Sequence, residues 1–285
     1  MTIKRVGIVG SGIMGSGVAE VAAKAGHEVV LRSRQQNTAD AMVAALEKSL
    51  AKQVEKGKLE ETDAKETFGR VSATAHLGDL ANCDLVIENI VEDLAPKKDL
   101  FNDLDQVCDP HTILASNTST LSVTELAMAT SRPDKVCGIH FFNPAPVMSL
   151  VELVRPLTAS DDTLAEVRAF AEACGKKPVE VKDQAGFIVN ALLFPYLNNA
   201  VKLLETGVAS RDDIDAAMKG GCGFPMGPLA VLDLVGLDTS LAIIDALYDE
   251  FRDPNYAAVP LLRRMVSAGS LGRKSGAGFY DYAKK

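Results

Sequence analysis

Cysteine and histidine are scarce in this sequence, and neither is spaced for metal binding. The 285 residues include five cysteines and four histidines. No Cys-x-x-Cys pair occurs, the number of cysteines is odd, and the histidines lie far apart. Zinc sites and disulfide frameworks depend on such spacings. We therefore expect no bound metal, and reduced thiols in a cytoplasmic protein.

Long apolar runs and a secretory pattern are also lacking. No apolar stretch approaches the roughly 20 residues that a membrane-spanning helix needs. Lys4 and Arg5 precede only a short apolar run that turns at Gly10, so we expect no signal peptide. Acidic residues outnumber basic ones, 38 to 30, which gives a formal charge of −8. Because such a surface repels polyanions, we expect neither nucleic acid nor a membrane as partner.

The beginning of the chain has the pattern of a dinucleotide-binding unit. A short apolar strand leads into a glycine motif, and a predicted helix (13–25) and second strand (28–32) follow it. The motif is Gly10-Ser-Gly12-Ile13-Met14-Gly15. In this context the glycines allow a tight turn, close approach of a pyrophosphate, and packing of helix on strand. The motif therefore predicts a bound dinucleotide, with a glycine turn of some other α/β protein as the alternative.

The end of the second predicted strand lacks an acidic residue. NAD-selective folds place Asp or Glu there to bind the ribose hydroxyls. This chain has Arg32, Ser33 and Arg34 instead. Two guanidinium groups beside a small hydroxyl suit a 2′-phosphate, and no acid is present to repel it. The pattern favours NADP(H) over NAD(H); the alternative is two solvated arginines at a permissive NAD site.

Strand and helix patterns alternate up to residue 182 and then give way to helices. Residues 38–68 are predicted to form two antiparallel helices. Further strands are expected at 71–73, 85–88, 113–116, 136–140, 149–154 and 178–181. The alternation predicts an α/β, Rossmann-type doubly wound sheet with a helical-hairpin insertion over residues 1–182. Residues 183–285 are expected to form an all-α substrate and dimerisation domain, with a kink at Pro195 and a glycine-rich loop at 220–228.

His140 and Glu152 suggest a proton-transfer pair. Oxidation of a secondary alcohol needs a base, and ketone reduction needs an acid. Imidazole suits both roles because its unperturbed pKa is ~6.5. Glu152 can fix the ring's tautomer if the strand after the Asn143–Pro146 turn folds back beside His140. With a bound dinucleotide, the pair predicts an alcohol/ketone oxidoreductase; a structural histidine and a surface glutamate are the alternative.

Taken together, these motifs resemble the short-chain 3-hydroxyacyl-CoA dehydrogenase family, of the 3-hydroxybutyryl-CoA dehydrogenase type. The matching stretches are Gly10–Gly15, Glu88–Glu92, Ser116–Ser119, His140–Glu152, Gly186–Asn190, Gly223–Pro228, Val235–Asp238 and Gly272–Tyr280. The resemblance implies interconversion of (S)-3-hydroxyacyl-CoA and 3-oxoacyl-CoA, and a homodimer formed through the C-terminal helices. The family usually carries Asp at the place of Ser33 and uses NAD, so this chain departs from the pattern there.

The resemblance also implies roles for single residues. His140 matches the family's acid/base, and Glu152 matches its orienting partner. Ser119 and Asn190 match residues that contact the reacting oxygen of the substrate. Positions near the nicotinamide or in the cofactor cleft are matched by Glu92, Lys97, Asn117 and Asn143.

Coenzyme A is a polyanion, and an acidic protein needs a local basic patch to bind it. Lys48, Lys52 and Lys56 recur every four residues and share one face of a predicted helix. With Ser49, they are candidates for the phosphates of an acyl-CoA substrate; a solvated helix face is the alternative. A sugar-acid dehydrogenase on the same scaffold, or a non-catalytic dinucleotide-binding protein, remains as an alternative function.

Overall fold

An eight-stranded sheet organises the first part of the chain in the computed structural model, which describes residues 3–283. Its strands are β1 (Arg5–Val9), β2 (Glu28–Arg32), β3 (Val71–Thr74), β4 (Leu85–Glu88), β5 (Ile113–Ser116), β6 (Val136–Phe141), β7 (Leu150–Arg155) and β8 (Lys177–Lys182). They lie in the order β3-β2-β1-β4-β5-β6-β7-β8. Strands β1 to β6 are parallel, and β7 runs antiparallel to β6. The predicted doubly wound sheet is confirmed, and its order reverses at β1, where such folds bind dinucleotides.

Helices cover this sheet, so its central strands are buried along their whole length. Helices α1 (Ile13–Lys24) and α6 (Asp161–Ala173) share one apolar core with the sheet. Helices α4 (Leu94–Val107) and α5 (Val123–Ala127) bury other apolar side chains, among them Leu104 and Leu126. Strands such as β4 and β5, which are apolar up to their last residue, are typical of parallel sheets covered in this way.

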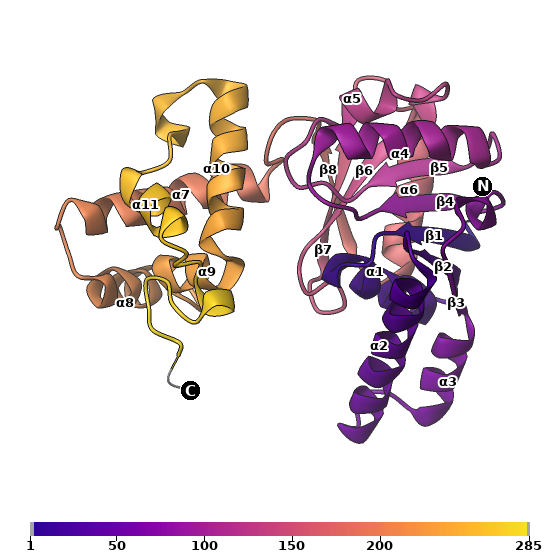
Figure 1. Cartoon of the computed structure of the whole chain (residues 1–285), viewed down its shortest axis with the longest axis horizontal. Coiled ribbons are helices and arrows are strands. Elements are labelled where there is room, and N and C mark those ends of the chain that lie inside the picture. The colour runs from indigo at the N-terminus through magenta and orange to yellow at the C-terminus, as the bar shows by residue number, and fades with distance from the viewer. Residues whose placement is uncertain (1–2, 284–285) are drawn as a thin grey trace. The chain divides into compact units, whose positions relative to one another are not determined.

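The expected helical hairpin is present between β2 and β3. It consists of α2 (Gln36–Glu55) and α3 (Glu61–Gly69), which lie side by side and extend away from the sheet (Figure 1). Gly57 makes the turn between them at a φ of 64°, a conformation that glycine adopts without steric cost. Glu20 of α1 holds α2 in place by accepting hydrogen bonds from Ser49 (3.0 Å) and Gln53 (2.8 Å).

The chain divides between Gln184 and Ala185 into two compact units. The second unit contains α7 (Val189–Glu205), α8 (Arg211–Cys222), α9 (Pro228–Val235), α10 (Leu237–Phe251) and α11 (Pro260–Ser267). These helices enclose an apolar core that includes Phe194, Leu232 and Leu247. Helix α7 continues through Pro195. Within residues 3–283, no helix is both long and apolar enough to cross a membrane.

The predicted bounds of the loop at residues 220–228 are wrong at both ends. Gly220 and Gly221 belong to α8, and Pro228 begins α9. Glycine costs a helix only about 1 kcal/mol, which does not forbid it there. The left-handed conformation that ends α8 falls on Gly223, with a φ of 69°. The connection is therefore shorter than the glycine content suggested.

Two buried carboxylates pack against glycines of the second unit's glycine-rich motifs. Asp215 accepts hydrogen bonds from two backbone amides in the first turn of α9, at 2.8 and 3.0 Å. A Cβ atom on Gly227 would lie 2.2 Å from its carboxyl carbon. Asp233 likewise accepts two amides near the end of the chain, and a Cβ atom on Gly278 would lie 2.0 Å from its Oδ1. These glycines serve the packing of the unit.

Candidate active site

The carboxyl ends of the parallel strands meet at one edge of the sheet. The register pairs Val9 with both Arg32 and Glu88, and it pairs Glu88 with Ser116. His140 lies near the end of β6, the next strand in the sheet. The glycine loop, the arginine pair and the candidate histidine therefore lie at, or directly after, strand ends that share one edge of the sheet.

His140 contacts its predicted partner Glu152 and also Ser119, which was predicted to contact the substrate. Strand β7 folds back along β6 and places Glu152 directly opposite His140. Nδ1 of His140 lies 2.7 Å from Oε2 of Glu152, and Nε2 lies 3.1 Å from the Ser119 hydroxyl. His140 is 5 % exposed and Glu152 is 1 % exposed. Because the carboxylate accepts the Nδ1 hydrogen, a neutral ring has Nε2 as its acceptor.

Glu92 fixes the turn that carries Ser119. Its Oε1 accepts hydrogen bonds from the Thr118 hydroxyl (2.6 Å) and from the backbone amides of Ser119 (2.8 Å) and Thr120 (3.2 Å). Its Oε2 lies 3.3 Å from the ammonium of Lys97. Glu92 therefore orients the hydroxyl that contacts His140, in addition to any contact with a cofactor.

Glu88 is a central residue of this site for which the sequence motifs predict no role. It is fully buried at the end of β4, and it lies 2.7 Å from the ammonium of Lys97, which is 1 % exposed. Its other oxygen accepts a hydrogen bond from the Ser116 hydroxyl (2.7 Å). Losing one member of such a pair leaves a buried charge and typically costs ~3–5 kcal/mol. The available sequence signal was a carboxylate ending an otherwise apolar strand.

The three asparagines predicted to belong to the site lie in different surroundings. Asn117 accepts a hydrogen bond from the backbone amide of Phe141 (2.7 Å) and donates one to Asn89 (2.8 Å), so it links the ends of β4, β5 and β6. Asn143 is exposed and follows β6, where it forms a cis peptide bond with Pro144. Asn190 belongs to the second unit, where it is buried at the start of α7.

The geometry of the glycine loop suits a dinucleotide. Gly10 has a φ of 124°, and a Cβ atom on it would lie 2.3 Å from the carbonyl oxygen of Asn89. A Cβ atom on Gly15 would lie 2.2 Å from the carbonyl oxygen of Gly10, whereas Gly12 faces open space. No side chain caps the start of α1, where Ile13 is exposed and Met14 half-buried. The amides of this first turn are therefore available to a diphosphate.

The arginine pair also suits an anion. Ser33 is buried directly after β2, and Arg34 is exposed. The Nε atom of Arg32 is buried and has no hydrogen-bond partner among the described residues. Burial and the neighbouring charge of Arg34 lower the pKa of Arg32. A phosphate beside the two guanidinium groups would offset the repulsion between them.

Of the four residues predicted to bind coenzyme A, the three lysines are exposed and the serine is not. Lys48 and Lys52 are exposed on α2, and Lys56 is exposed at its C-cap. The hydroxyl of Ser49 instead donates to Glu20 of α1, so it is engaged in packing. Within residues 3–283, no three His, Cys, Asp or Glu side chains are grouped to hold a metal ion.

Comparisons with known proteins match the whole described chain. The model of the 3-hydroxyacyl-CoA dehydrogenase NAD binding domain matches residues 5–184, and that of the C-terminal domain matches residues 186–282. A 3-hydroxybutyryl-CoA dehydrogenase of Clostridioides difficile is 49 % identical over 98 % of this chain and its own full length. The mitochondrial hydroxyacyl-coenzyme A dehydrogenase of Sus scrofa is 44 % identical over 98 % of this chain and 91 % of its own.

A solved structure supports the same family assignment. The crystal structure of (S)-3-hydroxybutyryl-CoA dehydrogenase from Ralstonia eutropha is 44 % identical, with a TM-score of 0.97 over 99 % of this chain and all of that chain. The resemblance inferred from the motifs is therefore confirmed. The chain belongs to the 3-hydroxyacyl-CoA dehydrogenase family of oxidoreductases.

Proposed function

We propose that this protein interconverts (S)-3-hydroxybutyryl-CoA and acetoacetyl-CoA with a nicotinamide dinucleotide. The observation that carries the proposal is the contact of His140 with both Glu152 and Ser119, at the edge of the sheet where the glycine loop lies. Relatives named for this activity support the choice of a short acyl chain.

The hydrogen bonds support the following roles for the side chains. In the oxidative direction, Nε2 of His140 takes the proton of the substrate hydroxyl, and Glu152 stabilises the resulting imidazolium through Nδ1. In the reductive direction the same atom returns the proton. Ser119 donates to the reacting oxygen, and the resemblance gives Asn190 a similar role. When bound, the dinucleotide supplies the hydride acceptor or donor.

The test is a steady-state assay of acetoacetyl-CoA reduction, followed by loss of reduced-nicotinamide absorbance. Free acetoacetate is the matched control because it has the same ketone without coenzyme A. Turnover of acetoacetyl-CoA alone supports the proposal. Equal turnover of acetoacetate would indicate a hydroxy-acid dehydrogenase instead, and no turnover of either would indicate a non-catalytic dinucleotide-binding protein.

We propose that the cofactor is NADP(H) in preference to NAD(H). Charge-assisted hydrogen bonds contribute ~1.5–3 kcal/mol each, so two arginine contacts to a 2′-phosphate predict kcat/KM roughly 10²-fold higher with NADPH than with NADH. The paired variant Ser33→Asp/Arg34→Ala should reverse this preference because it restores an acid and removes a cation. Equal values with the two cofactors in the unmodified protein would contradict the proposal.

We propose that Lys48, Lys52 and Lys56 bind the phosphates of coenzyme A. Replacing all three by alanine should raise the KM for acetoacetyl-CoA by roughly 10-fold, since exposed ion pairs contribute about 0.2–1 kcal/mol each. A short acetoacetyl thioester without the nucleotide serves as control substrate, and its KM should not change. The same KM for acetoacetyl-CoA in variant and unmodified protein would remove these lysines from the site.

We infer further that the second unit forms a homodimer. Apolar side chains are exposed on it, among them Leu192 (72 %), Val208 (67 %) and Leu234 (53 %). Exposed apolar surface of this kind is commonly buried between protein chains. Sedimentation at micromolar concentration should show the mass of a dimer, and a monomer would contradict the inference.

A cytoplasmic location is proposed from the cysteines. All five are free, and three of them, Cys83, Cys108 and Cys137, are buried. Burial raises the pKa of Cys83 to about 11 and that of Cys137 to about 12, so these thiols stay protonated. Unpaired cysteines of this kind suit a reducing compartment.

A further inference from the structure

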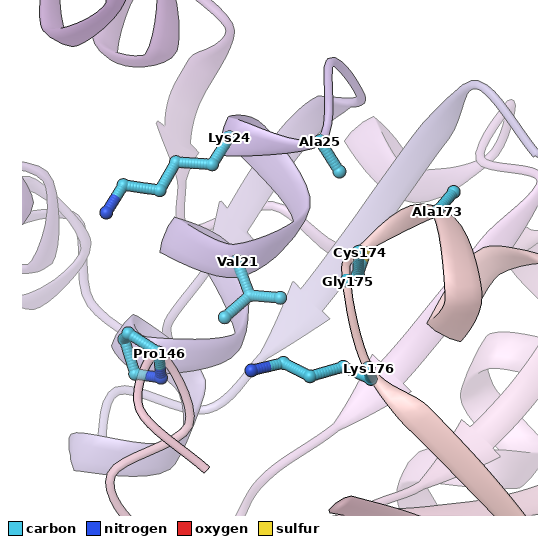
Figure 2. A pocket seen from close by; sticks show the side chains of 8 residues that line it. All are labelled: Val21, Lys24, Ala25, Pro146, Ala173, Cys174, Gly175 and Lys176. Carbon is cyan, nitrogen blue, oxygen red and sulfur yellow. The ribbon is translucent and has the colours of Figure 1, made fainter. Parts of the chain in front are cut away.

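Lys176 is a buried cation outside the constellation around His140. It extends along a cavity of about 300 Å³ in the first unit, toward the segment that carries Pro146, and Val21 of α1 lines the same cavity (Figure 2). Its ammonium donates to the carbonyl oxygens of Ala145 (2.6 Å) and Met148 (2.8 Å). Burial lowers the pKa of Lys176. Placing a lysine here therefore costs desolvation, which these two hydrogen bonds offset.

Both carbonyl groups belong to the β6–β7 loop, residues 142–149. This loop joins the strand of His140 to the strand of Glu152, and it carries Asn143. Within it, the backbone amides of residues 147 and 148 both donate to the carbonyl oxygen of Pro144. The position of the loop therefore affects both strands that carry the proton-transfer pair, His140 on β6 and Glu152 on β7.

The loop also packs on α1, the helix that follows the glycine loop. Ala145 is buried, and a Cβ atom on Gly17 of α1 would lie only 3.2 Å from its side chain and 3.3 Å from Pro146. Gly17 thus lets the loop approach α1 closely, while the Lys176 ammonium binds the loop through the carbonyl groups of Ala145 and Met148. Together these contacts connect the proton-transfer strands to the helix that begins at the glycine loop.

We propose that Lys176 is a positioning residue for the reaction: it fixes the β6–β7 loop against α1 and so sets the distance from His140 to the dinucleotide site. Without its ammonium, the buried carbonyl group of Ala145 loses its donor, and the loop must shift to reach water. A misplacement of ~1 Å at a reacting centre can cost up to about 10²-fold in rate. The inference rests on the proposed function, since its effect is measured in turnover.

The main test is Lys176→Met, which keeps the aliphatic stem and removes the donors. We expect kcat for acetoacetyl-CoA reduction to fall by roughly 10- to 100-fold and the KM for the dinucleotide to rise, with the KM for acetoacetyl-CoA unchanged. Lys177→Met is the matched control: this neighbour is exposed, and its only described tie to the loop is the backbone bond to Ser149, which the substitution keeps. Lys176→Arg should restore part of kcat.

A second variant separates positioning from folding. Gly17→Ala places a Cβ atom against the loop from the α1 side, so it should lower kcat, and its melting temperature shows whether the variant stays folded. Wild-type turnover in a folded Lys176→Met variant overturns the proposal. If that variant does not fold, wild-type turnover in Gly17→Ala overturns it. Should the unmodified protein lack activity on acetoacetyl-CoA, the proposed function fails, and weaker dinucleotide binding by Lys176→Met still tests the positioning role.

Discussion

Replacing His140 by asparagine is expected to lower kcat by roughly 10³- to 10⁴-fold while the protein remains folded. The side-chain amide nitrogen of asparagine can take the place of Nδ1, so Glu152 keeps a donor and is not left as an unpaired buried charge. Nothing then replaces Nε2, the atom that faces Ser119 at 3.1 Å. The loss should therefore appear in kcat for both reaction directions, with the KM for the dinucleotide nearly unchanged.

The matched control for this variant is His111→Asn. His111 also lies near a carboxylate, with Nε2 3.7 Å from Asp84, but its side chain is substantially exposed. We expect its kcat to equal that of the unmodified protein. Thermal unfolding of both variants separates lost chemistry from lost structure. Turnover within about tenfold of the unmodified protein in a folded His140→Asn variant would exclude the imidazole as the main acid/base, because general acid–base catalysis contributes at least ~10².

From the sequence, the contact between His140 and Glu152 depended on one condition, that the strand after the Asn143–Pro146 turn folds back beside His140. Two apolar segments flank a proline-containing turn, and residues equally distant from the middle of such a turn face each other when the strands pair antiparallel. The register fulfils this condition, with His140 directly opposite Glu152. The glycine loop was predictable for a similar reason, since its motif depends on neighbouring residues in the chain.

The contacts that support the site are of a different kind. Glu88 at the end of β4 pairs with Lys97 near the start of α4, and Lys176 reaches carbonyl groups about 30 residues earlier in the chain. Sequence periodicity identifies charged residues as exposed by default, so it gives no sign that these two lysines are buried. The hydrogen bond of Ser49 was equally unpredictable from periodicity, because only the packing of α2 on α1 directs its hydroxyl to Glu20.

The helical unit shows how tertiary structure overrides local propensity. Gly220 and Gly221 were predicted to lie in a loop, yet α8 continues through them to Cys222. The helix is fixed by buried residues such as Ile214 and Asp215, whose contacts lie in the unit's core and at the start of α9. Propensity differences of about 1 kcal/mol decide helix ends only where such contacts are absent.

Glu152→Gln is expected to lower kcat by roughly 10³-fold with little change in either KM. Glutamine has nearly the same shape, but it removes the negative charge 2.7 Å from Nδ1, so an imidazolium loses its counter-charge. Its amide group can also donate to Nδ1, which places the ring hydrogen on Nε2 and blocks acceptance of a hydroxyl proton. The substrates alone set the equilibrium constant, so kcat/KM should fall by the same factor in oxidation and reduction.

Glu180→Gln provides the control for this variant. Glu180 lies on β8, next to β7 in the sheet, and pairs with Arg155 at 2.6 Å on a partly exposed surface. Exposed pairs contribute about 0–1 kcal/mol to stability, so this change should leave turnover intact. Measuring both variants in both directions separates a loss of charge at the imidazole from a general effect on the sheet. Wild-type turnover in Glu152→Gln would remove Glu152 from the mechanism, whereas equal losses in the two variants would assign its effect to the sheet.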